Sequence, residues 1–195
     1  MTLPLFLPNK TRKLHKIFYK GELTGKSLLI LFVLIISGFI GNYVTIPLFF
    51  GADFLFGSIP VLLVLYFFGL RWGMLAAVIA HSYTYFLWGH PFGFINFVSE
   101  ALFVGLFLTK GHRNLLGLVG LFWLTIGMPL VWIEHGVIMH MGAITTAFIM
   151  LKQAINGIFN ALLATLAGHK LSAPSRQVFP PHTKYAENHS PGILI

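Results

Sequence analysis

The sequence predicts an all-α integral membrane protein, with six transmembrane helices in one bundle and the N- and C-termini in the cytoplasm. The 195-residue chain is 56% hydrophobic and only 9% charged, whereas soluble domains usually carry about 25% charged residues. Its mean hydropathy is +0.82. The chain contains no cysteine, which excludes disulfides, thiol nucleophiles and thiolate metal sites. This composition is typical of a chain buried in a bilayer.

Six apolar runs have the length that a helix needs to cross roughly 30 Å of hydrocarbon. The predicted spans cover residues 27–49, 54–70, 72–88, 92–109, 115–133 and 143–167. Every Lys and Arg except Lys152 lies before the first span, between spans 2 and 3, between spans 4 and 5, or after the last span. Because cytoplasmic segments are rich in Lys and Arg, this alternation places both termini in the cytoplasm and predicts a multi-pass protein of the inner membrane.

The spans differ in how they are expected to pack. The first contains Ser37 and Gly41, a small-residue step that permits close helix contact. Pro60 lies in the second span, where neighbouring helices can satisfy the carbonyl that it frees. The third is rich in glycine and alanine and is expected to lie centrally. The fifth contains Pro129, and Glu134 with His135 is expected to lie in the outer connection that follows it.

Two polar segments flank the six-span membrane domain, which occupies residues 27–168. Residues 1–26 form a basic cytoplasmic segment, in which 10–20 is expected to lie as a helix on anionic lipid. Residues 169–195 contain four prolines and form a polar cytoplasmic tail or a truncated linker. The net charge of +8 comes from these ends and connections. No basic stripe with interleaved aromatic residues is present, so nucleic acid is not an expected partner.

Three ionisable residues lie inside predicted spans, where each is costly and therefore a candidate for function. His81, Glu100 and Lys152 each lie about eight or nine residues from the outer end of their helix, which is roughly 12 Å at 1.5 Å per residue. Equal depth on three helices predicts one shared polar site. The simplest arrangement pairs the Glu100 carboxylate with the Lys152 ammonium, with His81 as a hydrogen-bond partner.

Helical spacing extends this site to a pocket wall. Residues three or four apart share a helix face. On three of the predicted spans, this spacing brings hydrogen-bonding, charged or aromatic side chains onto one face. Three such faces would enclose a small polar and aromatic ligand. The candidate ligand-binding residues are His81, Tyr85 and Trp88 on the third span, Asn96 and Glu100 on the fourth, and Lys152, Asn156 and Asn160 on the sixth.

Other interpretations of the same residues stay open. A buried Glu–Lys pair can be purely structural, and Asn and His often tie helices together. Glu134, His135, His140 and His90 could supply metal ligands, although His135 and His140 are not spaced for one helix face; no metal or other cofactor is predicted. No nucleophile elbow, paired aspartates or phosphate loop is present, so the chain is not expected to be an enzyme.

Several motifs resemble those of a known family. TIPLFFGAD at 45–53, SIP at 58–60 and YFFGLRWG at 66–73 are similar, in this order, to the substrate-binding S components of energy-coupling-factor vitamin transporters. They also resemble the six-span sensor modules of that type at the N-terminus of bacterial histidine kinases and diguanylate cyclases. The resemblance covers residues 27–168, and the run from 49 to 73 is closer to the sensor modules.

The resemblance implies a membrane-embedded binder whose small-molecule ligand enters from outside into the outer half of the bundle. The connections after the first and fifth spans would cap it. The first expectation is a sensor module that signals to a cytoplasmic partner. The alternative is the S component of a vitamin or micronutrient importer, in which Ser37 and Gly41 fall where S components dock on the transporter's membrane subunit.

Overall fold

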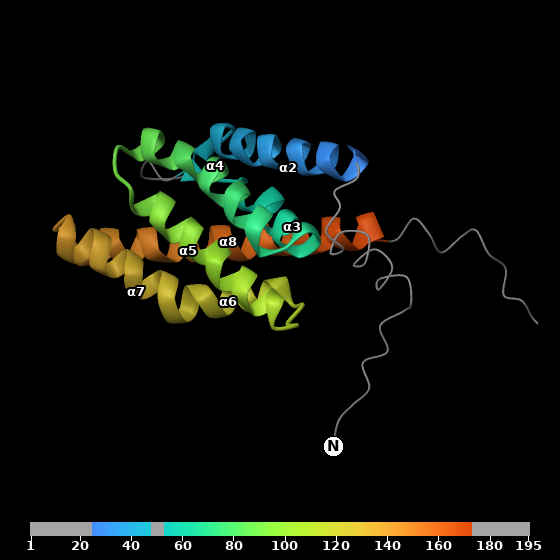
Figure 1. Cartoon of the computed structure of the whole chain (residues 1–195). Helices are drawn as coiled ribbons and strands as arrows, with labels where there is room; N and C mark the ends of the chain where they lie inside the picture. The colour runs from blue at the N-terminus through green and yellow to red at the C-terminus, as the bar shows by residue number, and fades with distance from the viewer. Residues whose placement is uncertain (1–24, 48–52, 173–195) are drawn as a thin grey trace, which may run out of the picture.

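The computed structural model describes residues 25–47 and 53–172, and these residues form a helical bundle (Figure 1). The predictions for residues 1–24 and 173–195 therefore lie outside the described residues. The elements, in chain order, are α2 Gly25–Tyr43, β1 Ile46–Pro47, β2 Asp53–Phe54, α3 Ser58–Phe68, α4 Leu70–Trp88, α5 Phe92–Thr109, α6 Leu115–Phe122, η2 Trp123–Gly127, α7 Met128–Val131, η3 Trp132–Ile138 and α8 Ala143–Ser172.

Four helices are long and apolar enough to cross a membrane, namely Gly25–Tyr43, Phe92–Thr109, Leu115–Ile138 and Ala143–Leu171. The all-helical membrane class is therefore confirmed. Two predicted spans do not meet this measure. α3 has 11 residues, or about 16 Å of helix, and α4 is long but carries Arg71 and a polar outer half.

The second predicted span, 54–70, is wrong in its bounds because its first residues are held in extended conformation. Pro47 pairs with Asp53 and Ile46 with Phe54 in a short antiparallel ladder. The chain turns into α3 only at Ser58 and leaves it at Gly69, whose φ of +84° suits a residue without a side chain. The first span likewise ends at Tyr43 rather than at residue 49.

The fifth helix is longer than predicted and runs without interruption from Leu115 to Ile138. Two π-helical turns, η2 and η3, lie on either side of Pro129. Proline has no N–H and crowds the preceding turn, and wider turns are one way that a helix accommodates such a residue. Glu134 and His135 are thus buried inside a helix, and the prediction that they lie in an outer connection is wrong.

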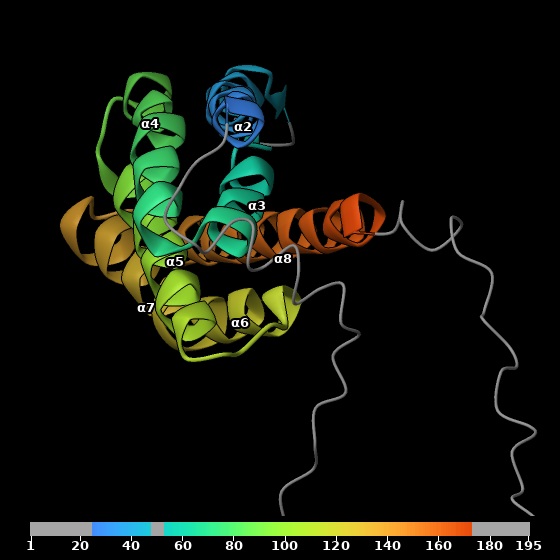
Figure 2. The ribbon, with the colours of Figure 1, turned by 45° about the vertical axis from the view of Figure 1, so that its right-hand side comes forward.

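The helices pack in three tiers (Figures 1 and 2). α2 lies on one side of the molecule, the α6–η3 helix lies on the other, and α8 passes between them. α4 packs against α2, α3 and α5, while α8 packs against α3, α6 and η3. The start of α2, the start of α6 and the end of α8 lie at one end of the bundle, and the α4–α5 and η3–α8 connections lie at the other.

The side chain of Asn42, on α2, forms hydrogen bonds with α4 and with the turn before α3. Its Nδ2 donates to Ala80 O at 2.8 Å and to His81 Nδ1 at 3.1 Å, and its Oδ1 accepts from the Gly57 N–H at 2.9 Å. A side chain on Gly57 would overlap the Asn42 amide, so the turn before α3 requires glycine. This buried amide fixes α2 and α3 on α4, beside the residues of the candidate site.

Candidate functional site

The buried face of α8 carries three of the predicted site residues. Lys152, Asn156 and Asn160 are spaced four apart, and only 8% of Lys152 and none of the two asparagines is exposed. Spacing by four on a continuous helix keeps side chains on one face. The predicted shared face of the sixth span is therefore confirmed.

The side chains of Asn156 and Asn160 both form hydrogen bonds with the backbone of Leu55. The Leu55 N–H donates to Asn156 Oδ1 at 2.9 Å, and Asn160 Nδ2 donates to the Leu55 carbonyl at 2.8 Å. Leu55 follows β2, so these bonds supply partners for a buried backbone outside any helix. Each amide keeps one unpartnered atom among the described residues, Asn156 Nδ2 and Asn160 Oδ1.

Lys152 lies among aromatic rings near the other end of the same face. Its Nζ is 4.9 Å from the centroid of the Trp88 ring, within the range of a cation–π contact. Trp88 stacks on His90 with ring centroids 6.2 Å apart, and His90 meets the edge of His135 at 5.6 Å. Within 25–47 and 53–172, the Lys152 ammonium has no hydrogen-bond acceptor and no carboxylate in ion-pair range.

His90 is the titratable group of this cluster that lies outside the helices, in the α4–α5 connection. Partial burial lowers its pKa below the ordinary value, and a backbone hydrogen bond opposes this shift. The shift favours a neutral imidazole at neutral pH. Its Nδ1 is buried without a partner among the described residues.

Glu100 does not form the predicted pair with Lys152. Its Oε2 accepts a hydrogen bond of 2.9 Å from Trp123 Nε1, and no ion pair joins the two residues in the described chain. Trp123 is fully buried, and its ring meets Phe97 at 6.2 Å. Glu100 therefore takes a neutral donor from the fifth helix, and no ion pair with Lys152 forms among the described residues.

His81 is buried and is linked to Glu100 through the rings of Phe97 and Trp123. Its ring stacks on Phe97, with centroids 4.8 Å apart and planes 18° from parallel. The amide of Asn42 donates to Nδ1, so the proton of a neutral imidazole is assigned to Nε2. Nε2 is buried and has no acceptor among the described residues. No hydrogen bond of the described chain joins His81 to Glu100 or Lys152.

Asn96 forms a hydrogen bond with Glu134, which was predicted to lie in an outer connection. Its Nδ2 donates to Glu134 Oε2 at 2.5 Å, which ties α5 to η3. Next to it, His135 Nδ1 lies 3.2 Å from the Val131 carbonyl. In the described part of the chain, no three His, Asp or Glu side chains come together in a group that could hold a metal ion.

Tyr85 is the one predicted residue that lies away from the polar interior. It is 51% exposed, and its ring packs against Phe86. Thr84, three residues after His81 instead of four, occupies the buried face and is completely covered. The prediction of Tyr85 as a wall residue is therefore wrong, because the buried face of α4 runs through Ala80, His81 and Thr84.

The structure thus places the remaining seven predicted residues in four local groups. Lys152 and Trp88 lie with His90 and His135, and His81 and Glu100 are linked through Phe97 and Trp123. Asn96 pairs with Glu134, and Asn156 and Asn160 bind the backbone of Leu55. Sequence reasoning missed Asn42, Trp123 and Glu134. Each is a polar or aromatic residue in or beside an apolar run, and that position is the signal that could have identified them.

No protein-family model, curated protein or solved structure matches the chain. The chemistry of the site must therefore be argued from its own residues.

Proposed function

We propose that this chain is a membrane-embedded small-molecule sensor module of the S-component type, whose ligand is a small carboxylate with a planar ring. The observation that carries the proposal is the environment of Lys152. This ammonium is largely buried, lies over Trp88, and has no ion-pair partner among the described residues. A buried charge is tolerated when it is paired, and a ligand carboxylate would supply the pair.

Polar atoms without partners support a ligand in the same interior. Among the described residues, Nε2 of His81, Oδ1 of Asn96, Oγ1 of Thr146, Oε1 of Gln153, Nδ2 of Asn156 and Oδ1 of Asn160 are buried and make no hydrogen bond. Leaving one such group unsatisfied costs about 1–3 kcal/mol. Ordered water or a ligand with both donors and acceptors would satisfy them.

The aromatic neighbours favour a planar ligand. Trp88, His90, Phe92 and His135 surround the region beside Lys152, with ring centroids 5.1–6.2 Å apart. Rings at such spacing pack directly against one another, and a planar ligand would add one more ring to this cluster. The carboxylate would face the ammonium, and the ring would lie against these side chains.

The proposed topology has six spans, both termini in the cytoplasm, and the site in the outer half. Its support is the distribution of charge over the bundle. Among the described residues, the Lys and Arg other than Lys152 lie at the start of α2, at the start of α4, between α5 and α6, and in the last turn of α8. The start of α2, the start of α6 and the end of α8 lie at one end of the bundle (Figure 1). The α4–α5 and η3–α8 connections contain histidines and no Lys or Arg. α3 would then be a short span that α4 and α8 shield from lipid.

Because the chain has no cysteine, single-cysteine variants test this orientation. A cysteine replacing His140 is expected to react with a membrane-impermeant maleimide in intact bacterial cells. A cysteine replacing Lys110 is expected to react only after the cells are permeabilised. The opposite labelling pattern would show that the orientation is inverted.

The packing of α2 supports the sensor interpretation over the importer. A Cβ on Gly41 would lie 3.1 Å from the backbone of Phe56, and one on Gly38 would lie 3.1 Å from Ala80. Gly41, one of the two residues of the predicted docking step, thus faces a contact within the chain. In the sensor, α8 would carry the signal, since about 30 Å of this helix lies between Lys152 and its proposed cytoplasmic end.

The experiment is a thermal unfolding series on the full chain in a neutral detergent. Benzoate, nicotinate and indole-3-acetate are each compared with the matching uncharged amide at equal concentration. At least one carboxylate is expected to raise the unfolding midpoint, because a ligand that binds only the folded state stabilises it. Its amide is expected to have a much smaller effect. Equal effects of the carboxylates and amides would exclude recognition through Lys152.

A further inference from the structure

A second hollow lies at the opposite end of the bundle from Lys152. It is a cavity of about 120 Å³ between α3, the start of α6 and the last turns of α8. Its volume is well above the roughly 10–15 Å³ that one water molecule requires. None of the residues discussed as the ligand site lines it, so it is a separate site.

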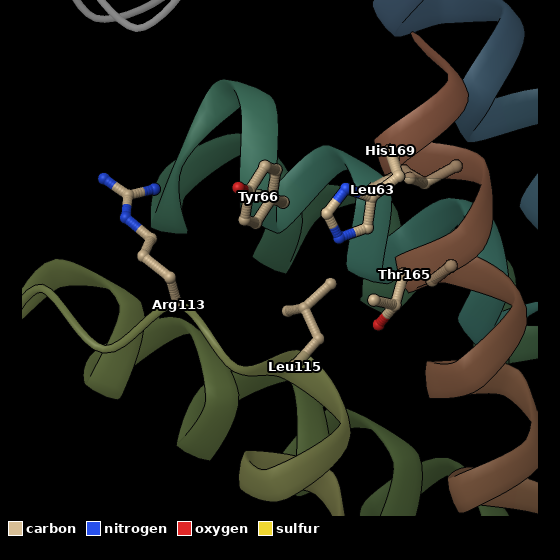
Figure 3. Close-up of a pocket in the computed structure, with 8 residues that line it drawn as sticks. Leu63, Tyr66, Arg113, Leu115, Thr165 and His169 are labelled. Carbon is tan, nitrogen blue, oxygen red and sulfur yellow. The ribbon is translucent and has the colours of Figure 1, made fainter. Parts of the chain in front are cut away.

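The polar side chains of this cavity come from three different elements (Figure 3). Tyr66 belongs to α3, Arg113 to the connection before α6, and His169 to α8. In the close-up, Tyr66 lies between Arg113 and His169. The Arg113 guanidinium carbon is 5.7 Å from the centroid of the Tyr66 ring. This cation–π contact positions the guanidinium at the rim.

The other residues that line the cavity are uncharged. Leu63, Leu115, Ala164 and Gly168 are apolar. The Thr165 hydroxyl donates to the Ala161 carbonyl at 2.7 Å, so its proton is already used. The described lining contains no carboxylate. An anion entering here would therefore meet Arg113, His169 and the Tyr66 hydroxyl as donors, and the described lining would present no like charge to it.

The surroundings also favour an anion. Lys110 and His112 lie on the connection that carries Arg113, and Lys170 follows His169. The amino end of α6 adds positive partial charge, while His169 and Lys170 offset the negative carboxyl end of α8. A guanidinium matches the oxygens of a phosphate geometrically and stays charged at every physiological pH.

We propose that this cavity is a binding site for a phosphate group, held by Arg113, His169 and Tyr66. The group could belong to the head of an anionic phospholipid or to a soluble phosphate ester. The position at the basic end of a membrane bundle suits the first source. Since α8 also carries Lys152, an occupant would contact the same helix as the proposed ligand of the outer site.

The test measures binding by the full chain in a neutral maltoside detergent, through the thermal unfolding midpoint. Two probes are titrated, dihexanoyl phosphatidylglycerol and inorganic phosphate, with sodium chloride at matched ionic strength as the blank. The midpoint is expected to rise with a phosphate probe beyond the blank. A response to both probes assigns the site to a phosphate group as such. A response to the lipid alone assigns it to a lipid headgroup.

Four variants make the result specific. Arg113→Gln and His169→Gln are each expected to raise the apparent Kd of the probe about tenfold. Arg71→Gln and Lys170→Gln remove the same kinds of charge from the same end but do not line the cavity, and they are expected to change it little. Lys152→Met is expected to leave this response intact, which separates the two sites.

The proposal is overturned if neither probe raises the midpoint beyond the blank. It is also overturned if Arg71→Gln weakens binding as much as Arg113→Gln, because the effect would then be general surface charge. All four charge variants lie at exposed positions. Their midpoints without probe are expected to match the wild type, and this confirms that they fold.

Discussion

Gly157→Ala is expected to lower the free energy of unfolding by about 2–4 kcal/mol. A Cβ at this position of α8 would overlap Nε1 of Trp123. The indole cannot retreat, because it is fully buried and packs against Gly127, Phe97 and Phe122. Displacing it also breaks the hydrogen bond to Glu100, which leaves a buried carboxyl group without its donor.

Gly120→Ala is the matched control for this substitution. Gly120 also lies inside a helix, but a Cβ there would meet no heavy atom of the described chain within 4 Å. This variant is expected to be at least as stable as the wild type, because alanine favours helix by about 1 kcal/mol over glycine. Thermal and denaturant unfolding, followed by tryptophan fluorescence, compares the two. Similar changes in the free energy of unfolding for both variants would show that Trp123 is not packed closely against Gly157 of α8.

Lys152→Met is expected to make the ligand-free protein more stable, by about 1 kcal/mol or more. The substitution replaces a buried ammonium, which has no ion pair among the described residues, by an apolar side chain of similar length. The lost cation–π contact with Trp88 offsets part of the gain, since such contacts contribute roughly 0.5–2 kcal/mol. Denaturant unfolding of the purified variant in neutral detergent measures the change.

Lys110→Met is the control for this second variant. Lys110 also lies over an aromatic ring, with Nζ 5.5 Å from the Phe107 centroid, but it is exposed at the other end of the bundle. Its replacement is expected to leave stability nearly unchanged. If Lys152→Met proved strongly destabilising instead, Lys152 would be a structural residue and the ligand interpretation would lose its main support.

Hydropathy was sufficient to predict the helical membrane class and the approximate position of each helix, because lipid burial requires long apolar runs. It did not predict where the helices end. The chain stays extended at Leu55 because Asn156 and Asn160, about a hundred residues later, bond its backbone. A local sequence pattern cannot show that side-chain amides this far along the chain bind the backbone N–H and C=O of Leu55.

The residues of the site were partly predictable, but their partners were not. His81, Asn96, Glu100 and Lys152 are buried as their positions inside apolar runs indicated. The expected Glu100–Lys152 pair followed from charge alone, and it failed because Trp123 supplies a donor to Glu100. In the sequence, a tryptophan in an apolar run does not reveal whether it faces lipid or a carboxylate.

Glu134 and His135 illustrate a different difficulty. The span was predicted to end at residue 133, with Glu134 and His135 in the connection that follows it. The wider turns around Pro129 instead let the helix continue to Ile138. Glu134 is then held inside the bundle by Asn96, which gives the polar interior a carboxylate that the sequence placed outside it.

The most direct test of the ligand-binding site is native mass spectrometry of the protein released gently from bacterial membranes. The wild type is expected to retain a small anionic adduct, much lighter than a phospholipid. Lys110→Met is expected to retain the same adduct, and Lys152→Met is expected to lose it. A wild type free of any such adduct, or a Lys152→Met variant that carries it at the wild-type level, would contradict the assignment of Lys152 to a ligand site.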